Sequence, residues 1–217
     1  MNDRKDTIRR YIRATWGLFI AAFGVMLTIN ANIGLAPWDT LAMGIAGKTG
    51  IPYGTSFVIV SCLVLVFDLL MREQMGFGTF VDAFLFGYMT DFFRWLNICP
   101  KQHNLWIGIL YMVVGFLIMS YGQYVYMSAG ESCGPRDTFI VGLGKFVKKV
   151  PIGVVNIVVF STVTLFGWLL GGKVGVGTLI AAFGAGLEMQ FVFHLVKFEP
   201  RDVEHDNIIV SVKKLIS

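Results

Sequence analysis

Charged residues are scarce in this chain of 217 residues: Asp, Glu, Lys and Arg together make up 15% of it, against 55% hydrophobic residues. Soluble domains average about 25% charged residues, so a chain of this composition lacks the charged surface that a soluble core needs. Two long runs, 105–127 and 152–170, contain none of the four charged residue types. Because about 20 apolar residues cross a bilayer as a helix, the sequence predicts an all-α polytopic membrane protein and excludes a soluble enzyme.

Cysteine and metal-binding motifs are also nearly absent. The three cysteines, Cys62, Cys99 and Cys133, are widely spaced and form no CxxC pair, which excludes a disulfide framework. The three histidines show no metal-ligand spacing, and HExxH, P-loop and GxSxG motifs are missing. We therefore expect no enzymatic activity, no cofactor and no metal. The net charge of +4 does not indicate a nucleic-acid partner, because the basic residues border the apolar runs, where membrane topology places them.

Hydropathy predicts six long spans and two short helices. The long spans cover 16–33, 55–71, 77–96, 105–127, 152–170 and 176–196. The short segments, 37–47 and 135–146, each reach across only about half of the hydrocarbon core at about 1.5 Å per residue. They either are re-entrant or cross the bilayer as short helices. The positive-inside rule barely separates these arrangements, and we favour a full crossing.

The domain organisation follows from these spans. We expect a basic cytoplasmic N-terminus over 1–14, a first membrane repeat over 15–98, a second over 104–196 and a cytoplasmic tail over 197–217. Both arrangements of the short segments place the two termini in the cytoplasm. The basic start followed by an apolar run resembles a secretory signal, but the run is long and Pro37 follows its small-residue end directly. An uncleaved first span is therefore expected.

An internal repeat relates the two halves of the chain. Its matched residues are Pro37, Asp39, Thr40 and Gly44 with Pro135, Asp137, Thr138 and Gly142, and Gly76, Gly78 and Thr79 with Gly175, Gly177 and Thr178. Each half thus reads as span, Pro-x-Asp-Thr turn, short helix, span, Gly-x-Gly-Thr turn and span. The turns predict capping side chains at the starts of the following helices, with Thr79 and Thr178 as N-cap candidates.

Ionisable residues inside a membrane are candidates for function because an unpaired charge there is costly. Asp39 and Asp137 come first since both repeats contain them. They either line a polar solute site where two broken helices converge between the halves or only cap the short helices. Arg136, which replaces Trp38 of the first repeat, either binds an acidic solute or pairs with Glu131 or Asp137.

Four further residues extend this candidate site. Asp82 and Glu188 are not duplicated, and each half supplies one, either as the acid of a proton-coupled transporter or as the partner of a basic residue at a span end. Asn30 and Asn32 end the first span, where they either line a polar cavity or interact with the membrane interface.

Other polar residues are expected to have structural roles. The spacing of Asp68 and Arg72, and of Asp91 and Arg94, predicts local ion pairs on one helix face. A stripe of small residues in the last span, at Gly177, Ala181 and Ala185 with Ala182 and Gly186 alongside, would let another helix approach closely. That helix could belong to the same chain or to a second copy in a homo-oligomer.

Three segments resemble one family. These are 34–40 (GLAPWDT), 134–138 (GPRDT) and 167–178 (GWLLGGKVGVGT), which occur in order at matching separations. They resemble the YczE/YyaS/YitT-type small bacterial membrane proteins over roughly residues 15–195. The resemblance implies a multi-pass protein of the bacterial cytoplasmic membrane, of a kind often labelled a permease.

This chain departs from the pattern of that family at two places. Some members of this family carry a basic residue early in the span that begins near Ile152 and an acid one turn later, where this chain has Asn156 and Phe160. Their last span often has a Gly-Pro step, where this chain has Ala185 and Gly186. These departures argue against transferring a charged translocation path to this chain.

The sequence as a whole predicts a secondary transporter of a small polar or charged solute. Its site is expected between the two repeats, at Asp39, Asp137, Arg136, Trp38, Asn30, Asn32 and Glu131, with Asp82 or Glu188 as the coupling acid. The expected partners are this solute and the lipid bilayer. The alternative is a non-transporting membrane scaffold or regulator of another protein.

Overall fold

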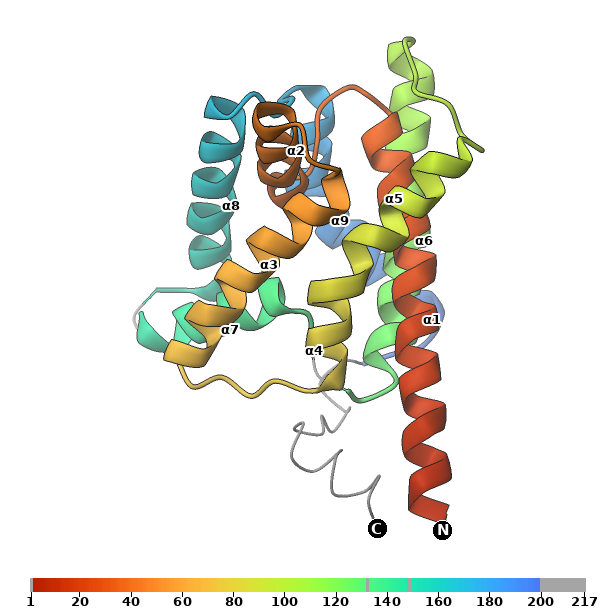
Figure 1. Cartoon of the computed structure of the whole chain (residues 1–217), viewed down its shortest axis with the longest axis vertical. Helices are drawn as coiled ribbons and strands as arrows, with labels where there is room; N and C mark the ends of the chain where they lie inside the picture. Colours follow the sequence, from red (N-terminus) through yellow and green to blue (C-terminus); the bar gives the residue numbers. More distant parts are fainter. Residues whose placement is uncertain (1, 132, 148–149, 200–217) are drawn as a thin grey trace.

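The structure is a computed structural model that describes residues 2–131, 133–147 and 150–199. These residues form helices and connecting turns, and they include no β-strand (Figure 1). Most of the predicted tail, 200–217, lies outside the described residues. Five of the helices are long and apolar enough to cross a membrane.

The helices follow the predicted spans closely. In chain order they are α1 (Asn2–Asn30), α2 (Pro37–Thr49), α3 (Tyr53–Leu70), α4 (Phe77–Val81), the π-helix η1 (Asp82–Phe86), α5 (Gly87–Leu96), α6 (Leu105–Met127), α7 (Pro135–Phe146), α8 (Ile152–Leu169) and α9 (Val176–Leu195). One prediction needs correction, because the span expected over 77–96 consists of the consecutive segments α4, η1 and α5. The basic start is helical and continues directly into the first apolar span as part of α1.

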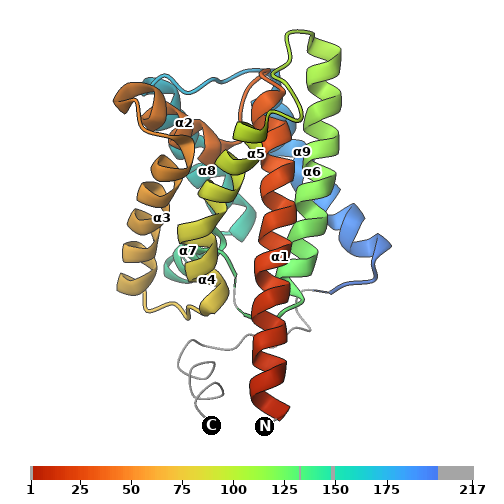
Figure 2. The ribbon, with the colours of Figure 1, turned by 45° about the vertical axis from the view of Figure 1, so that its right-hand side comes forward.

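Helices α1 and α6 lie side by side and run in opposite directions through the molecule (Figures 1 and 2). α1 ends and α3 begins at the same end, which we call the far end, whereas α7 lies toward the end where α1 begins, which we call the near end (Figure 1). The chain therefore enters the segment containing α2 from the far end and leaves it at the same end. The 13 residues of α2 also span only about 20 Å at 1.5 Å per residue, so this arrangement favours a re-entrant helix over the full crossing favoured above.

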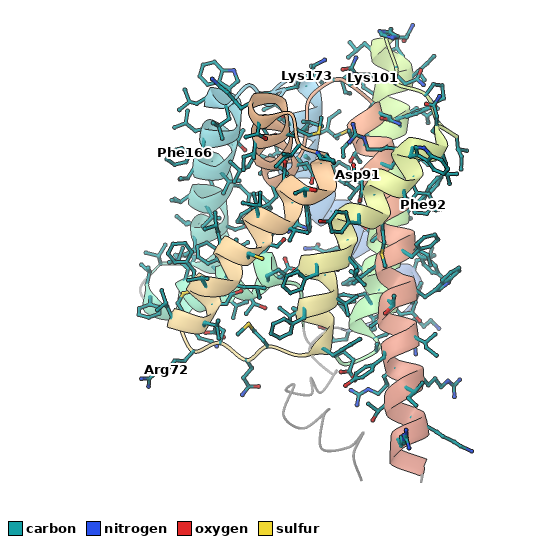
Figure 3. The ribbon with its side chains drawn as sticks, in the orientation of Figure 1. Arg72, Asp91, Phe92, Lys101, Phe166 and Lys173 are labelled. Atoms are coloured by element: carbon teal, nitrogen blue, oxygen red, sulfur yellow. The ribbon has the colours of Figure 1, made fainter. Side chains whose placement is uncertain are left out.

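Side chains at the molecular edges agree with this arrangement. Figure 3 places Lys101 and Lys173 toward the far end and Arg72 at the near end, pointing away from the bundle. Phe92 and Phe166 project from opposite sides of the bundle between the two ends (Figure 3), and both side chains are exposed. Exposed aromatic residues between two charged ends are typical of a surface that faces lipid.

Glycines allow α1 and α6 to approach closely. A Cβ atom added at Gly24 would lie 2.5 Å from the carbonyl oxygen of Gly115, and one added at Gly122 would lie 2.5 Å from the backbone nitrogen of Ala21. Real Cβ atoms do not approach backbone so closely, so both positions require glycine. Small residues at helix crossings in membranes serve this purpose, and here they fix the central helix pair around which the other helices pack.

The segment before each short helix, α2 or α7, is hydrogen-bonded to the first turn of another helix. The backbone N–H of Gly78 donates to the carbonyl oxygen of Glu131 at 2.9 Å, and that of Gly177 donates to Ile33 at 2.8 Å. Gly78 and Gly177 are matched in the repeat, as are the turns around them. These two equivalent hydrogen bonds hold the extended segments before α7 and α2 against the first turns of α4 and α9.

The turn before α4 also shows how the threonines act. Thr79 and Thr178 were predicted as N-caps, but the N-cap positions are Gly76 and Gly175. Each threonine lies three residues later, and its hydroxyl accepts a hydrogen bond from the N-cap backbone, at 3.3 Å for Thr79 and 3.2 Å for Thr178. The side chain thus satisfies a backbone donor from inside the helix, as the acidic residue of a capping box does.

Arg10 attaches the first helix to the segment before α7. Its guanidinium donates to the carbonyl oxygens of Ala129 at 2.7 Å and Gly130 at 3.0 Å. Its Nε also lies 3.4 Å from a carboxylate oxygen of Glu131, a side chain with no solvent exposure. Glu131 therefore pairs with Arg10 of α1, and the predicted alternative of a pair with Arg136 is wrong.

An Arg10→Met variant is expected to unfold earlier than the wild type. Removing the cation from a buried carboxylate costs about 3–5 kcal/mol in full burial, and the partial exposure of Arg10 reduces this to about 2 kcal/mol. For a chain of this length the unfolding midpoint in detergent should fall by about 4–8 °C. Arg9→Met, which removes an exposed cation one residue away, is the control and should leave the midpoint within about 2 °C. Equal midpoints for the two variants would contradict this role of Arg10.

Candidate functional site

A cavity of about 170 Å³ lies between the two halves of the chain. Its polar and charged lining comes from Trp38, Asp39, Asp82, Gln123, Tyr126, Arg136 and Asp137, and its apolar lining includes Phe86, Phe116, Phe160, Ala181 and Ala185. The first residues of α2 and of α7 both reach it. Two helix N-termini, one from each half, therefore converge on one internal space, as expected for broken helices in transporters.

The α2 side of the cavity is fixed by Pro37 and Asp39. Pro37 occupies the first turn of α2, where its missing N–H costs nothing. Asp39 makes no capping hydrogen bond; its carboxylate instead accepts a hydrogen bond of 2.8 Å from the hydroxyl of Tyr53 on α3. The cap reading of Asp39 is therefore wrong, and its buried carboxylate is positioned by a second helix.

The α7 side of the cavity supplies its positive charge. The guanidinium carbon of Arg136 lies 4.4 Å from the ring centroid of Phe57 and 6.0 Å from that of Phe86. Such stacking on aromatic faces stabilises a cation. Neither Arg136 nor Asp137 forms an ion pair within 4.0 Å in the described part of the chain. Asp137 makes no capping hydrogen bond either, and its side chain is exposed although it lines the cavity, so solvent reaches this space.

Asp82 approaches the cavity from the only π-helical segment among the described residues. It begins η1 and is 5% exposed. Single π-turns inside helices are frequent at functional sites because they rotate side chains out of the regular helical register. A Cβ atom added at Gly134 would lie 2.6 Å from one carboxylate oxygen of Asp82 and 4.0 Å from one of Asp137. The absence of a side chain at Gly134 thus lets two carboxylates face the same small volume.

Four of the predicted site residues lie outside this cavity. Asn30 donates to the carbonyl oxygen of Cys99 at 2.7 Å, and Asn32 donates to that of Gln102 at 2.9 Å, so both fasten loops at the far end. Glu131 lies behind the segment that precedes α7, paired with Arg10. Glu188 is half-buried on α9 and does not line the cavity. The structure brings together Trp38, Asp39, Asp82, Arg136 and Asp137.

The two predicted local ion pairs have different outcomes. Asp91 and Arg94 pair at 3.1 Å, as expected, and Asp91 also accepts a hydrogen bond from the backbone of Gly54 at 2.6 Å. Figure 3 shows Asp91 where α3 and α5 meet. The pair predicted between Asp68 and Arg72 does not form. Asp68 is completely buried and its carboxylate has no hydrogen-bond partner among the described residues, whereas Arg72 follows the helix end in a left-handed conformation and is exposed.

Sequence reasoning missed the tyrosines of the site. Tyr53 begins α3 and Tyr126 lies one residue before the end of α6, and each is 1% exposed. Tyr126 lines the cavity, and its hydroxyl has no hydrogen-bond partner in the described structure. The position of Tyr53, one residue after Pro52 and close in sequence to the Asp39 turn, was the available signal.

Comparisons with known proteins identify relatives. A model of a family of unknown function, DUF6198, matches residues 8–194. The chain is 30% identical over 194 residues to the uncharacterized membrane protein YczE of Bacillus subtilis (strain 168), covering 87% of each chain. It is 28% identical over 181 residues to an uncharacterized protein of Haemophilus influenzae, covering 83% of this chain and 82% of that one, and 22% identical over 192 residues to the uncharacterized protein YyaS of Bacillus subtilis, covering 87% and 94%. No solved structure matches.

Proposed function

This chain is a multi-pass helical membrane protein of the DUF6198 family, and from that membership and its central cavity we propose that it is a secondary transporter of a small polar or charged solute. The observation that carries the proposal is the meeting of the first turns of α2 and α7 at a cavity lined by Arg136 and three aspartates. Helix ends and charged side chains are costly inside a bilayer unless they bind something. A scaffold would have no need for this arrangement.

The same proposal explains the order of the helices. We propose two duplicated units, α1–α5 and α6–α9, each with three long crossings and one re-entrant helix, where α4, η1 and α5 together form the third crossing of the first unit. Three crossings per unit invert the second unit relative to the first, which agrees with the antiparallel α1 and α6 (Figures 1 and 2). Inverted repeats with a site between them are a common transporter design, because rocking of one unit against the other exposes the site alternately.

The proposed orientation places both chain termini in the cytoplasm of a bacterium, with the protein in its cytoplasmic membrane. The first turns of α1 support this orientation, since Arg4, Lys5, Arg9 and Arg10 gather at the near end. Basic residues beside a span favour the cytoplasmic side.

The stripe of small residues on α9 bears on the homo-oligomer. Gly177 and Ala181 are buried within the chain, and a Cβ atom at Gly177 would lie 2.7 Å from the carbonyl oxygen of Gly34. Ala182 and Gly186 on the same helix are exposed. The inner half of the stripe therefore packs inside the chain, and we propose that only its outer half is open to a second copy.

Flux measurements in proteoliposomes test the transporter directly. Guanidinium, alanine, lactate and glycerol serve as a small cation, zwitterion, anion and neutral solute, each followed with and without a pH gradient. We expect at least one to cross faster than in protein-free liposomes. If none of the four does so, the transporter proposal fails and the scaffold becomes the better reading.

Substitution of the two aspartates that are matched in the repeat tests the site. We expect Asp137→Asn to reduce the flux by about tenfold or more, a loss of about 1.4 kcal/mol of stabilisation per factor of ten, because its carboxylate is open to the cavity. Asp39→Asn should have a smaller effect, since the amide can still accept from Tyr53. Glu73→Gln is the control, because Glu73 pairs with Lys145 outside the cavity. Wild-type flux in a double Asp39→Asn, Asp137→Asn variant would remove the proposed site.

A further inference from the structure

The central cavity contains polar groups that the protein itself leaves without partners. Asp82 is 5% exposed and its carboxylate forms no hydrogen bond or ion pair with another described residue, and Tyr126 is 1% exposed with an unpartnered hydroxyl. Both side chains line the cavity. Burying such groups without partners is costly, so a ligand that hydrogen-bonds to both groups would be stabilised in this cavity.

The charge balance of the cavity indicates the sign of that ligand. Asp39, Asp82 and Asp137 contribute three carboxylates, whereas Arg136 is the only Lys or Arg among the described residues of the lining. The N-termini of α2 and α7 add a positive charge of about 0.5 each. The cavity thus carries an excess of about one negative charge, which a ligand with a single positive charge would neutralise.

The rest of the lining distinguishes an organic cation from a metal ion. Phe86, Phe116, Phe160 and Trp38 surround the charged groups, and aromatic faces attract organic cations, as Phe57 and Phe86 already do for the guanidinium of Arg136. No group of three or more His, Cys, Asp or Glu side chains in the described chain could hold a metal ion. The volume of about 170 Å³ is also below the roughly 300–1,000 Å³ of pockets for drug-sized ligands.

We infer that the solute is a small organic monocation, such as a primary alkylammonium ion, whose charged group lies between Asp82 and Asp137. This inference rests on the proposed transport function and gives its substrate class. Gly134 sets the geometry, because both carboxylates approach the point that its Cβ atom would occupy. The ammonium group donates to the two carboxylates and to the Tyr126 oxygen, and the alkyl body lies against the phenylalanine rings.

Binding measurements on the purified full-length protein in detergent test this inference separately from flux. Propylammonium, propanol and propionate share a three-carbon body but differ in charge, and ligand-observed NMR titration gives a dissociation constant for each. We expect propylammonium to bind at least tenfold more tightly than the other two. The Asp82→Asn variant should lose at least tenfold of this affinity, and Gly134→Ala should lose a similar amount by displacing Asp82. The Glu73→Gln control should bind as the wild type does.

Each other result overturns the inference. Tighter binding of propanol or propionate, or no binding of propylammonium, would show that the site does not take a small monocation. Unchanged affinity in a folded Asp82→Asn variant would place any amine elsewhere. Flux of lactate or glycerol but not guanidinium in liposomes would retain the transporter and discard the cation, whereas absence of all flux would remove the transport function itself.

Discussion

An Arg136→Gln variant is expected to lose at least about tenfold of its flux, a change of about 1.4 kcal/mol, and to unfold earlier than the wild type. Arg136 is the only Lys or Arg among the described residues that line a cavity shared by three carboxylates. Its loss leaves these carboxylates, two of them buried, to repel one another without a nearby cation. Flux in proteoliposomes and the unfolding midpoint in detergent are the two measurements.

Two further variants separate the contributions of charge and shape. Arg136→Lys keeps the charge but lacks the planar group that stacks on Phe57, so it should recover stability and only part of the flux. Arg136→Gln combined with Asp137→Asn restores the charge balance and should recover stability without flux. If Arg136→Gln transports as the wild type does, Arg136 has no role in the pathway.

Introducing leucine at Gly24 is expected to prevent normal packing of the central helix pair. The added Cβ would lie 2.5 Å from the Gly115 carbonyl oxygen and 2.6 Å from the Met119 nitrogen, both backbone atoms. Overpacking typically costs about 1–3 kcal/mol of stability. Because backbone atoms cannot move away as a side chain can, we expect a cost at the upper end of this range. The unfolding midpoint should therefore fall by about 6–12 °C.

Gly153 on α8 provides the matched control for this prediction. A Cβ atom added there meets nothing within 4 Å, so Gly153→Leu should change the midpoint little while adding the same side chain. Size-exclusion chromatography in detergent, read by intrinsic fluorescence, gives both midpoint and aggregation. A Gly24→Leu variant as stable as Gly153→Leu would mean that α1 and α6 can separate without loss, contrary to their close crossing.

The membrane helices were the most predictable part of the molecule because their limits are marked by residues with strong local effects. Proline at 37 and 135 can occupy only the first turn of a helix, and both short helices begin there. The run 105–127 is uninterrupted, and α6 has these bounds. The direction of the short helices was less predictable, because positive charges are distributed almost equally well in either arrangement.

The members of the candidate site were only partly predictable. The repeat identified Asp39 and Asp137 because a polar match is rare in an apolar chain. Their hydrogen-bond partners could not be predicted, since the contact of Asp39 with Tyr53 depends on how α2 packs against α3. Asp82 was a candidate on its own, but its approach to Asp137 depends on a π-helical segment that has no clear sequence signal.

The structure shows where two of the positions that depart from the family pattern lie. Phe160 and Ala185, the positions where the resemblance to this family implied an acid and part of a Gly-Pro step, both line the cavity. Sequence alone could interpret these replacements only as a reason for caution. Both replacements therefore fall on the lining of the candidate site, which the sequence alone could not show.

The bonds from Arg10 to Ala129 and Gly130 join residues 119 and 120 positions apart. A ribosome that adds about 5–20 residues per second needs roughly 6–24 s to make that stretch. For α1 to insert into the bilayer as it is synthesised, it must remain there by its own apolar surface, because α6, against which it packs, is completed only later in synthesis. The contacts of Arg10 therefore form only after residues 129 and 130 have been synthesised.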